Sequence, residues 1–184
     1  MSFAFGHLVG GWLVGLLVEW GARRRFTNVE WAFLLFGALL PDADFILAWL
    51  FRSNLHRQFT HSLLFVIFCF ILIVALGNLA SLASRFFFTQ REIVGAGIAL
   101  SAGVFSHSVM DMTLGAPGIP LFWPAQIGVW FFGMKQFAIG PLFGGSRETI
   151  VSQLKLAVFE MGLGVLWLAW LWWRGNLKFT KRFK

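Results

Sequence analysis

The sequence has a single cysteine, no tyrosine and few charged residues. One cysteine excludes an intramolecular disulfide, so cysteine usage gives no information about the cellular compartment. Charged residues make up 12% of the 184 positions, which is about half of their share in an average soluble domain. Hydrophobic residues make up 58%, and the mean hydropathy is +0.76. This balance excludes an ordinary water-soluble globule and indicates an integral membrane protein.

Long apolar stretches and many aromatic residues point the same way. The chain has 23 Phe and 10 Trp, which suit a lipid-facing surface and its interfacial belts. Five stretches approach the roughly 20 residues that a helix needs to cross a hydrocarbon core: residues 3–20, 29–51, 62–83, 93–114 and 150–173. We therefore expect an all-α, polytopic membrane helix bundle of about five transmembrane helices, forming one integral membrane domain over residues 1–184.

Two segments depart from a simple series of membrane-spanning helices. The first apolar stretch is followed, not preceded, by Arg23, Arg24 and Arg25, so we interpret it as a retained helix and not as a cleaved signal. Residues 115–149 contain four of the five prolines and cannot form one regular helix. We expect an irregular outer segment there, re-entrant or interfacial, packed on the bundle before the last helix.

The basic residues predict an orientation. One side of the five-span topology collects ten of them: Arg23, Arg24, Arg25, Arg85, Arg91, Arg174, Lys178, Lys181, Arg182 and Lys184. The other side has Arg52, Arg57, Lys135 and Arg147. By the positive-inside rule the first side is cytoplasmic. The N-terminus is then outside, and residues 174–184 form a basic cytoplasmic tail. We expect the protein to lie in the cell membrane, that is, the inner or plasma membrane. Because the basic residues lie between apolar spans, we expect no nucleic-acid partner.

All four histidines and all three aspartates lie within or at the ends of the apolar spans: His7, Asp42, Asp44, His56, His61, His107 and Asp111. An aspartate at mid-membrane costs about 2.5–3.5 kcal/mol on insertion scales, so some interaction must offset the three carboxylates. The orientation deduced from Lys and Arg places all seven residues near the outer ends of their spans. This agreement is independent, because none of the seven was used to derive it.

The spacing of these residues is compatible with metal binding. His107 and Asp111 are four residues apart, so both project from one helix face. Asp42 and Asp44 follow Pro41, where the helical ladder breaks. His56 and His61 flank a turn. Each motif alone is more typical of a hydrogen-bonded pair or a turn, but their convergence on one surface favours a metal site.

Imidazole and carboxylate ligands suit zinc, and manganese or iron are alternatives. Seven candidate ligands exceed the three or four of one zinc ion. We therefore expect either two ions, or one ion with acid–base helpers.

These motifs resemble the YdjM-like, LexA-regulated family of membrane-bound metal-dependent hydrolases. The matching pieces are Gly6-His7, Leu39-Leu40-Pro41-Asp42-Ala43-Asp44, the block from His56 to Leu64, Ser106-His107 with Asp111 and Thr113, and Gly118 to Pro124. They occur in the family's order over residues 6–124, and the His-Arg-x-x-Thr-His-Ser-Leu-Leu block is the most specific. The resemblance implies a membrane hydrolase that uses a divalent metal, and it leaves the substrate open.

The leading hypothesis is hydrolysis of a phosphoester in a lipid or lipid-linked substrate at the outer leaflet. The expected ligands are His7, Asp42, Asp44, His61, His107 and Asp111. His56 is either a further ligand or a general acid–base group. Arg57 could bind a phosphate oxygen or could be an interfacial charge. Thr60 and Trp123 are candidate substrate contacts, although an aromatic belt also accounts for Trp123.

Two other functions fit parts of the pattern. A zinc-dependent lipid amidase or esterase would keep the metal and change the bond, but the outer basic residues favour a phosphate. A non-enzymatic metal or proton transporter should place its acidic and histidine residues at successive depths, whereas these cluster at one depth. Haem ligation would give the three aspartates no role.

Overall fold

The computed structural model describes residues 4–44, 50, 58–83, 88–114, 118–125 and 127–129, and isolated positions between 151 and 170. The chain divides into two compact units, Met1–Ala138 and Ile139–Lys184. The first unit holds all the helices described below. The expected fifth span falls mainly on positions outside the described residues.

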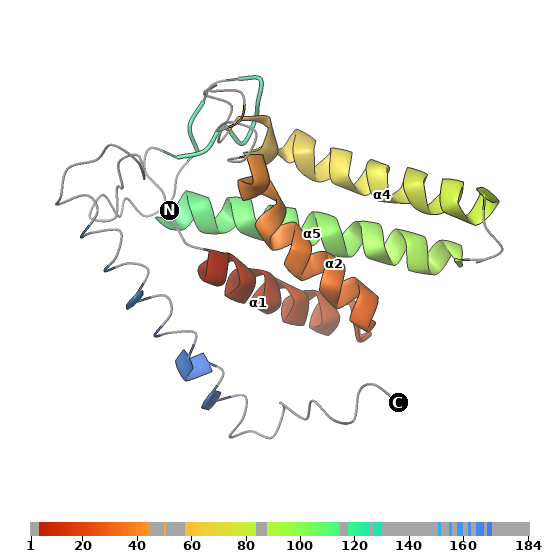
Figure 1. Ribbon diagram of the computed structural model, residues 1–184, viewed down its shortest axis with the longest axis horizontal. Helices are drawn as coiled ribbons and strands as arrows, with labels where there is room; N and C mark the ends of the chain where they lie inside the picture. The colour runs from red at the N-terminus through yellow and green to blue at the C-terminus, as the bar shows by residue number, and fades with distance from the viewer. Residues whose placement is uncertain are drawn as a thin grey trace. The chain divides into compact units, whose positions relative to one another are not determined.

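The described part of the first unit is helical. It contains the α-helices α1 (Ala4–Ala22), α2 (Asn28–Leu39), α4 (Leu63–Ala83) and α5 (Gln90–Leu114), and the short 3-10 helices η1 (Leu40–Ala43) and η2 (Phe59–His61) (Figure 1). Within the described residues, three segments are long and apolar enough to cross a membrane: Phe5–Ala22, Leu63–Ala83 and Gln90–Thr113. The expected helical membrane bundle is confirmed, while the count of five spans stays a prediction.

The second expected span does not continue as one regular helix through its described part. The α-helix α2 ends at Leu39, and Pro41 lies in the first turn of the 3-10 helix η1. A helix of 12 residues is about 18 Å long, well short of a hydrocarbon core of about 30 Å. Proline cannot donate the hydrogen bond that would continue α2. This break sets the direction of the residues that follow, Asp42 and Asp44.

Helices α2 and α5 touch through their backbones. The buried residues of α2 are Glu30, Leu34, Gly37 and Ala38, which lie on one helix face. A Cβ added to Gly37 would collide with the carbonyl of Leu100, and one added to Gly103 would collide with the carbonyl of Leu34. Small residues allow such close approach in membrane proteins, where packing drives helix association. The glycines therefore fix the position of the C-terminal end of α2 against α5.

Ionic contacts hold the turn between α1 and α2. The Arg24 guanidinium donates hydrogen bonds of 2.6 and 3.1 Å to the Glu30 carboxylate, and this hydrogen bonding raises the pKa of Arg24. Glu30 also forms a capping box with Thr27 at the start of α2. The Glu19 carboxylate accepts a 2.6 Å hydrogen bond from the backbone N–H of Phe26. The turn thus connects two helices without leaving the buried Glu30 uncompensated.

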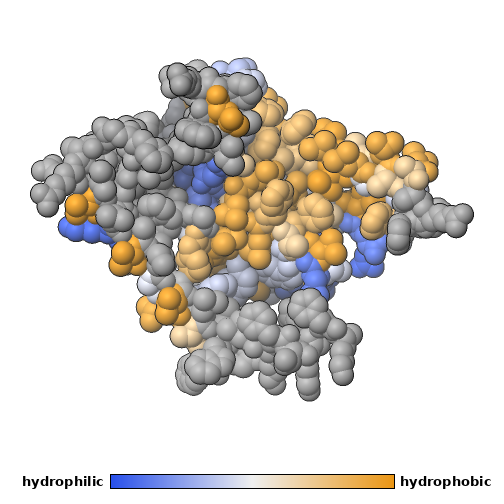
Figure 2. All heavy atoms as spheres, in the orientation of Figure 1, coloured by the Kyte–Doolittle hydropathy of each residue, from blue (hydrophilic) through white to orange (hydrophobic). Residues whose placement is uncertain are grey.

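The outer surface of the helices is apolar. Figure 2 shows hydrophobic residues gathered across much of the described face. On α4 the exposed large hydrophobic side chains are Leu64, Ile67, Phe68, Ile71, Leu72, Leu76, Leu79 and Leu82. A row of this length would be unfavourable in water. It is what contact with lipid chains requires.

Candidate metal centre

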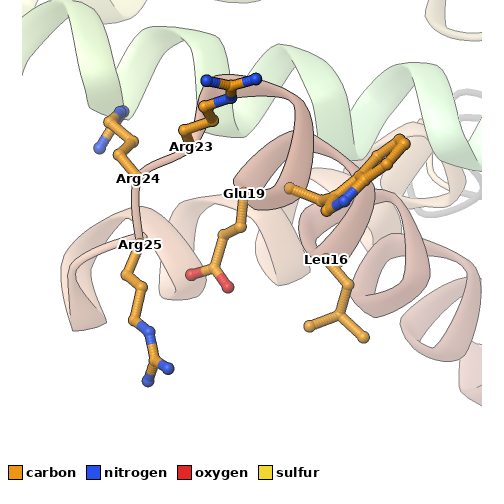
Figure 3. A pocket seen from close by; sticks show the side chains of 6 residues that line it. Leu16, Glu19, Arg23, Arg24 and Arg25 are labelled. Carbon is orange, nitrogen blue, oxygen red and sulfur yellow. The ribbon is translucent and has the colours of Figure 1, made fainter.

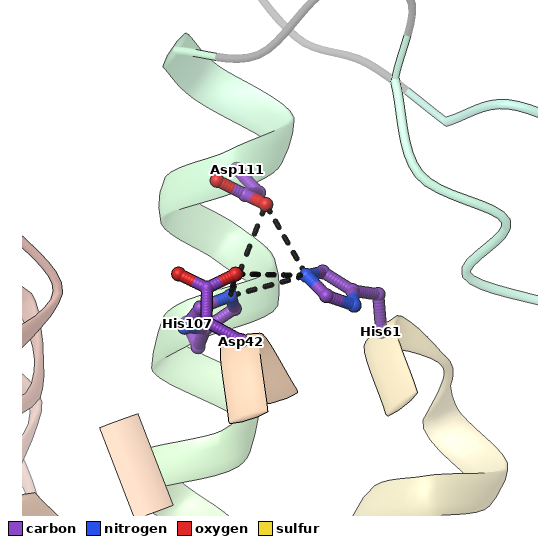
Figure 4. Close-up of side chains that lie close together, drawn as sticks. All are labelled: Asp42, His61, His107 and Asp111. Carbon is purple, nitrogen blue, oxygen red and sulfur yellow. Dashed lines mark hydrogen bonds and ion pairs between the residues drawn. The ribbon is translucent and has the colours of Figure 1, made fainter. Parts of the chain in front are cut away.

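Four side chains converge where η1, η2 and the C-terminal part of α5 meet. Asp42, His61, His107 and Asp111 each offer one ligand atom, and these four atoms lie within 4.8 Å of one another. Figure 4 shows Asp42 reaching in from η1, His61 from η2, and His107 and Asp111 from one face of α5. Residues that are up to 69 positions apart in the chain therefore meet at one point, as the sequence pattern predicted for this group.

The distances within this quartet suit a single ion. The Nε2 atom of His61 lies 3.2 Å from Nε2 of His107 and 3.4 Å from Oδ2 of Asp111. Oδ1 of Asp42 lies 3.7 Å from Nε2 of His61 and 3.5 Å from Nε2 of His107. The donors around a tetrahedral ion with bonds of about 2.0–2.1 Å are separated by about 3.3–3.4 Å. The quartet could therefore hold a divalent ion with only small shifts.

The quartet is buried on most sides. His61 and His107 have no exposed surface, and Asp111 is 1% exposed. The Asp42 side chain, in contrast, is 36% exposed. Removing a carboxylate such as Asp111 from water is costly unless a cation or hydrogen bonds compensate it. The burial thus favours a bound cation, and the exposed face of Asp42 marks the side from which a ligand could enter.

The backbone of α2 orients His107. Its Nδ1 lies 2.8 Å from the carbonyl oxygen of Ala38. A carbonyl can only accept, so Nδ1 carries the proton and donates to it, which leaves the lone pair of Nε2 facing the quartet. Sequence reasoning missed Ala38, because a backbone carbonyl has no signature of its own. The neighbouring Gly37 is the sequence feature that could have indicated this contact, because a glycine there lets α2 approach α5 closely.

A hydroxyl and a carboxylate orient His61 in a similar way. The Thr60 hydroxyl lies 3.0 Å from Nδ1 of His61 and donates a hydrogen bond to Oδ2 of Asp44. Asp44 is 4% exposed, and its Oδ2 is 3.8 Å from Nδ1 of His61. The structure thus places Asp44, an expected ligand, behind His61 and outside the quartet. It places the Thr60 hydroxyl, an expected substrate contact, between Asp44 and His61.

His7 lies on the other side of the quartet. It is 1% exposed, and its ring stacks on the ring of His107 with centroids 3.7 Å apart and planes 12° apart. Its Nε2 is 3.8 Å from Oδ2 of Asp42 and 3.6 Å from Oδ1 of Asp111. Six of the seven residues singled out by the sequence therefore gather at one end of the helices.

The remaining predicted site residues have mixed outcomes. His56 and Arg57 lie outside the described residues. Trp123 packs edge-on against Phe59, with ring centroids 5.3 Å apart, and is partly exposed. The segment before Trp123 is tied to the start of α4, because the Leu63 N–H donates a 2.9 Å hydrogen bond to the Leu121 carbonyl. Trp123 therefore lies beside the turn that carries His61.

A depression lined by charged and apolar side chains lies at the C-terminal end of α1. It is lined by Leu16, Glu19, Trp20, Arg23, Arg24 and Arg25 (Figure 3). The three guanidinium groups point in different directions in this view, and Arg24 is engaged with Glu30. Arg23 follows His7 by 16 positions, which corresponds to about 24 Å along a helix. The depression is thus remote from the metal-binding quartet.

Comparison with known proteins agrees with this architecture. The family model described as "YdjM inner membrane protein" matches residues 1–177. The inner membrane protein YbcI of Escherichia coli (strain K12) is 31% identical over 147 residues, covering 74% of this chain and 79% of that protein. No solved structure matches the chain.

The fold and these matches define a helical membrane protein with a possible metal-binding group. The chain belongs to the YdjM family, which confirms the resemblance seen in its motifs.

Proposed function

We propose that this protein is a membrane-bound metal-dependent hydrolase that cleaves a phosphoester of a lipid or lipid-linked substrate at the outer leaflet. The observation that carries the proposal is the spacing of the quartet. Two imidazole nitrogens and two carboxylate oxygens, from three separate segments, lie within 4.8 Å of one another. Each imidazole is also held through its other nitrogen, an arrangement common around metal ligands.

In this proposal His61, His107, Asp42 and Asp111 hold the ion. Two nitrogen and two oxygen donors at tetrahedral spacing favour zinc, and manganese or iron are the alternatives. A divalent ion there supplies Lewis-acid polarisation and lowers the pKa of a coordinated water toward neutrality. Asp44 and Thr60 act as positioning residues, because their contacts orient the ring of His61.

The assignment to the outer leaflet is supported by the two ends of α1. Arg23, Arg24 and Arg25 lie at one end, and the positive-inside rule assigns that end to the cytoplasm. His7 lies about 24 Å away along the helix, a distance comparable with the thickness of a hydrocarbon core of about 30 Å. The quartet then lies near the outer headgroups, with the exposed face of Asp42 toward the substrate.

Two further roles rest on the sequence alone. Arg57 directly follows His56 in the block that leads to His61, and a guanidinium matches the geometry of phosphate oxygens. We assign Arg57 to the phosphate and His56 to acid–base work. A third assignment, that of Trp123 to an acyl chain of the substrate, is supported by its partly exposed position beside Phe59.

The test combines metal analysis with a substrate screen. The protein purified in detergent should hold stoichiometric divalent metal and should release phosphate or a phosphorylated headgroup from phospholipids or polyprenyl phosphates. His61→Ala and Asp111→Ala should lose both the metal and the activity. Ser101→Ala is a matched control on α5, because it removes a hydroxyl that bonds the Val66 carbonyl outside the quartet.

Several results would contradict the proposal. The proposal would be wrong if the wild-type protein held no divalent metal. It would also be wrong if His61→Ala and Asp111→Ala held as much metal as the wild type. Cleavage of acyl-amide lipids alone would replace the phosphoesterase by an amidase. Metal flux across proteoliposomes without any hydrolysis would replace the enzyme by a transporter.

A further inference from the structure

Both carboxylates of the quartet face histidines on two sides. Asp42 directs Oδ1 toward His61 and His107, at 3.7 and 3.5 Å, and Oδ2 toward His7, at 3.8 Å. Asp111 directs Oδ2 toward His61 and His107, at 3.4 and 3.8 Å, and Oδ1 toward His7, at 3.6 Å. Each carboxylate therefore divides its two oxygens between the quartet and a second position beside His7.

The stacked rings of His7 and His107 give this second position a defined distance from the first. The ring centroids are 3.7 Å apart and the planes nearly parallel. The Nε2 atoms of both rings face the same two carboxylates. Two-metal centres in phosphatases and nucleases have their ions about 3.5–4 Å apart. The spacing of the rings thus matches the spacing that two ions sharing these carboxylates would need.

We propose that His7 Nε2, Asp42 Oδ2 and Asp111 Oδ1 form a second divalent-cation site, with both aspartates bridging it to the quartet. The distances of 3.6 and 3.8 Å from Nε2 of His7 exceed those of hydrogen bonds. They lie within about 0.5 Å of the donor spacing around an ion. The inference rests on the proposed function, because it takes the quartet as the first metal site.

The two sites differ in the number of protein ligands. The quartet supplies four, so an ion there gains a water or substrate ligand only by expanding its coordination. The site at His7 has three among the described residues, and three protein ligands with an open position are typical of catalytic zinc. Asp42, which is 36% exposed, belongs to both sites and gives the open position a route to the surface. The second site therefore has the more accessible position for a water or substrate, and the quartet ion acts beside it.

The test counts ions and measures their coupling. Wild-type protein loaded with Mn²⁺ should hold two ions per chain by mass spectrometry and should give an exchange-coupled electron paramagnetic resonance spectrum. His7→Ala should hold one ion and give the six-line spectrum of isolated Mn²⁺. His7→Gln keeps a side chain of similar reach and serves if the alanine variant does not fold. Leu13→Ala, on the same helix and 49% exposed, is the control and should keep both ions.

The outcomes separate the two proposals. Two ions in the wild type and one in the His7 variants support the second site. One uncoupled ion in the wild type, unchanged by the His7 variants, overturns the second site and leaves the quartet intact. A wild type that binds no divalent ion overturns the proposed function as well. The wild-type spectrum decides the question even if neither His7 variant folds.

Discussion

The Nδ1 atom of His61 lies 3.0 Å from the hydroxyl oxygen of Thr60. Because the Thr60 proton is donated to Asp44, the same oxygen accepts from Nδ1 of His61. The imidazole is thereby held in the form whose Nε2 lone pair points at the quartet. A threonine with no direct contact to an ion would thus control one of its ligands.

Replacing Thr60 by valine should weaken ion binding by about 10–100-fold, the usual effect of removing such a partner. Valine keeps the branched shape and removes only the hydroxyl. The affinity is measured by competition with a fluorescent chelator. Thr60→Ser keeps a hydroxyl and should restore most of the affinity, whereas equal affinities for valine and threonine would show that the hydroxyl has no orienting role.

Gly103→Ala should destabilise the protein by about 1–3 kcal/mol, as overpacking usually does. The added methyl group would meet the Leu34 carbonyl and push α2 away from α5. The Ala38 carbonyl would then separate from His107, so ion affinity should fall together with the thermal unfolding midpoint in detergent. An unchanged midpoint would contradict the close helix contact.

The control for that variant is Gly21→Ala. A Cβ at Gly21 has no neighbour within 4 Å, and alanine favours a helix over glycine by about 1 kcal/mol. This variant should leave ion affinity unchanged and should unfold at the same temperature as the wild type or slightly above it.

Glu30→Gln should lower the free energy of unfolding by about 1–2 kcal/mol. The amide keeps the size of the side chain and removes the charge that pairs with Arg24. Denaturation in mixed micelles measures the effect. Glu92 makes a similar contact with Thr89 at the exposed start of α5, so Glu92→Gln should have a smaller effect. Equal effects would mean that burial of Glu30 adds nothing.

The orientation can be tested with single cysteines. Cys69 is buried, and Cys69→Ala provides a cysteine-free background. In intact cells Arg57→Cys should react with a membrane-impermeant maleimide, and Arg23→Cys should react only after permeabilisation. The reverse pattern would move the site to the cytoplasmic side and would remove the outer leaflet from the proposed function.

The sequence predicted α1, α4 and α5 to within a few residues, because each is a long apolar run bounded by polar residues. It also predicted that residues near 7, 42, 61 and 107 would lie at one depth, because successive membrane spans cross the bilayer in opposite directions. For α2 the sequence predicted a break at Pro41, because proline interrupts the helical ladder. It did not predict that the α-helix before this break would be only 12 residues long, since the apolar run continues past residue 41.

The roles of individual site residues could not be separated from the sequence. Asp42 and Asp44 are the same residue type, so the sequence does not distinguish their roles. They lie on either side of Ala43 in a 3-10 turn, and this turn directs their carboxylates to different sides of His61. The sequence predicted Thr60 as a substrate contact, because the position of Asp44 behind His61 cannot be deduced from residue types. Such assignments depend on backbone geometry, which residue types do not specify.

The donors of the quartet enter the membrane at different times during synthesis. Asp42 and His61 precede α4, whereas His107 and Asp111 lie near the end of α5. A nascent chain with α1, α2 and α4 already inserted offers only part of the set, which is too little for tight binding. Ion loading would therefore follow insertion of α5, and the bound ion would lock together segments that the ribosome releases one after another.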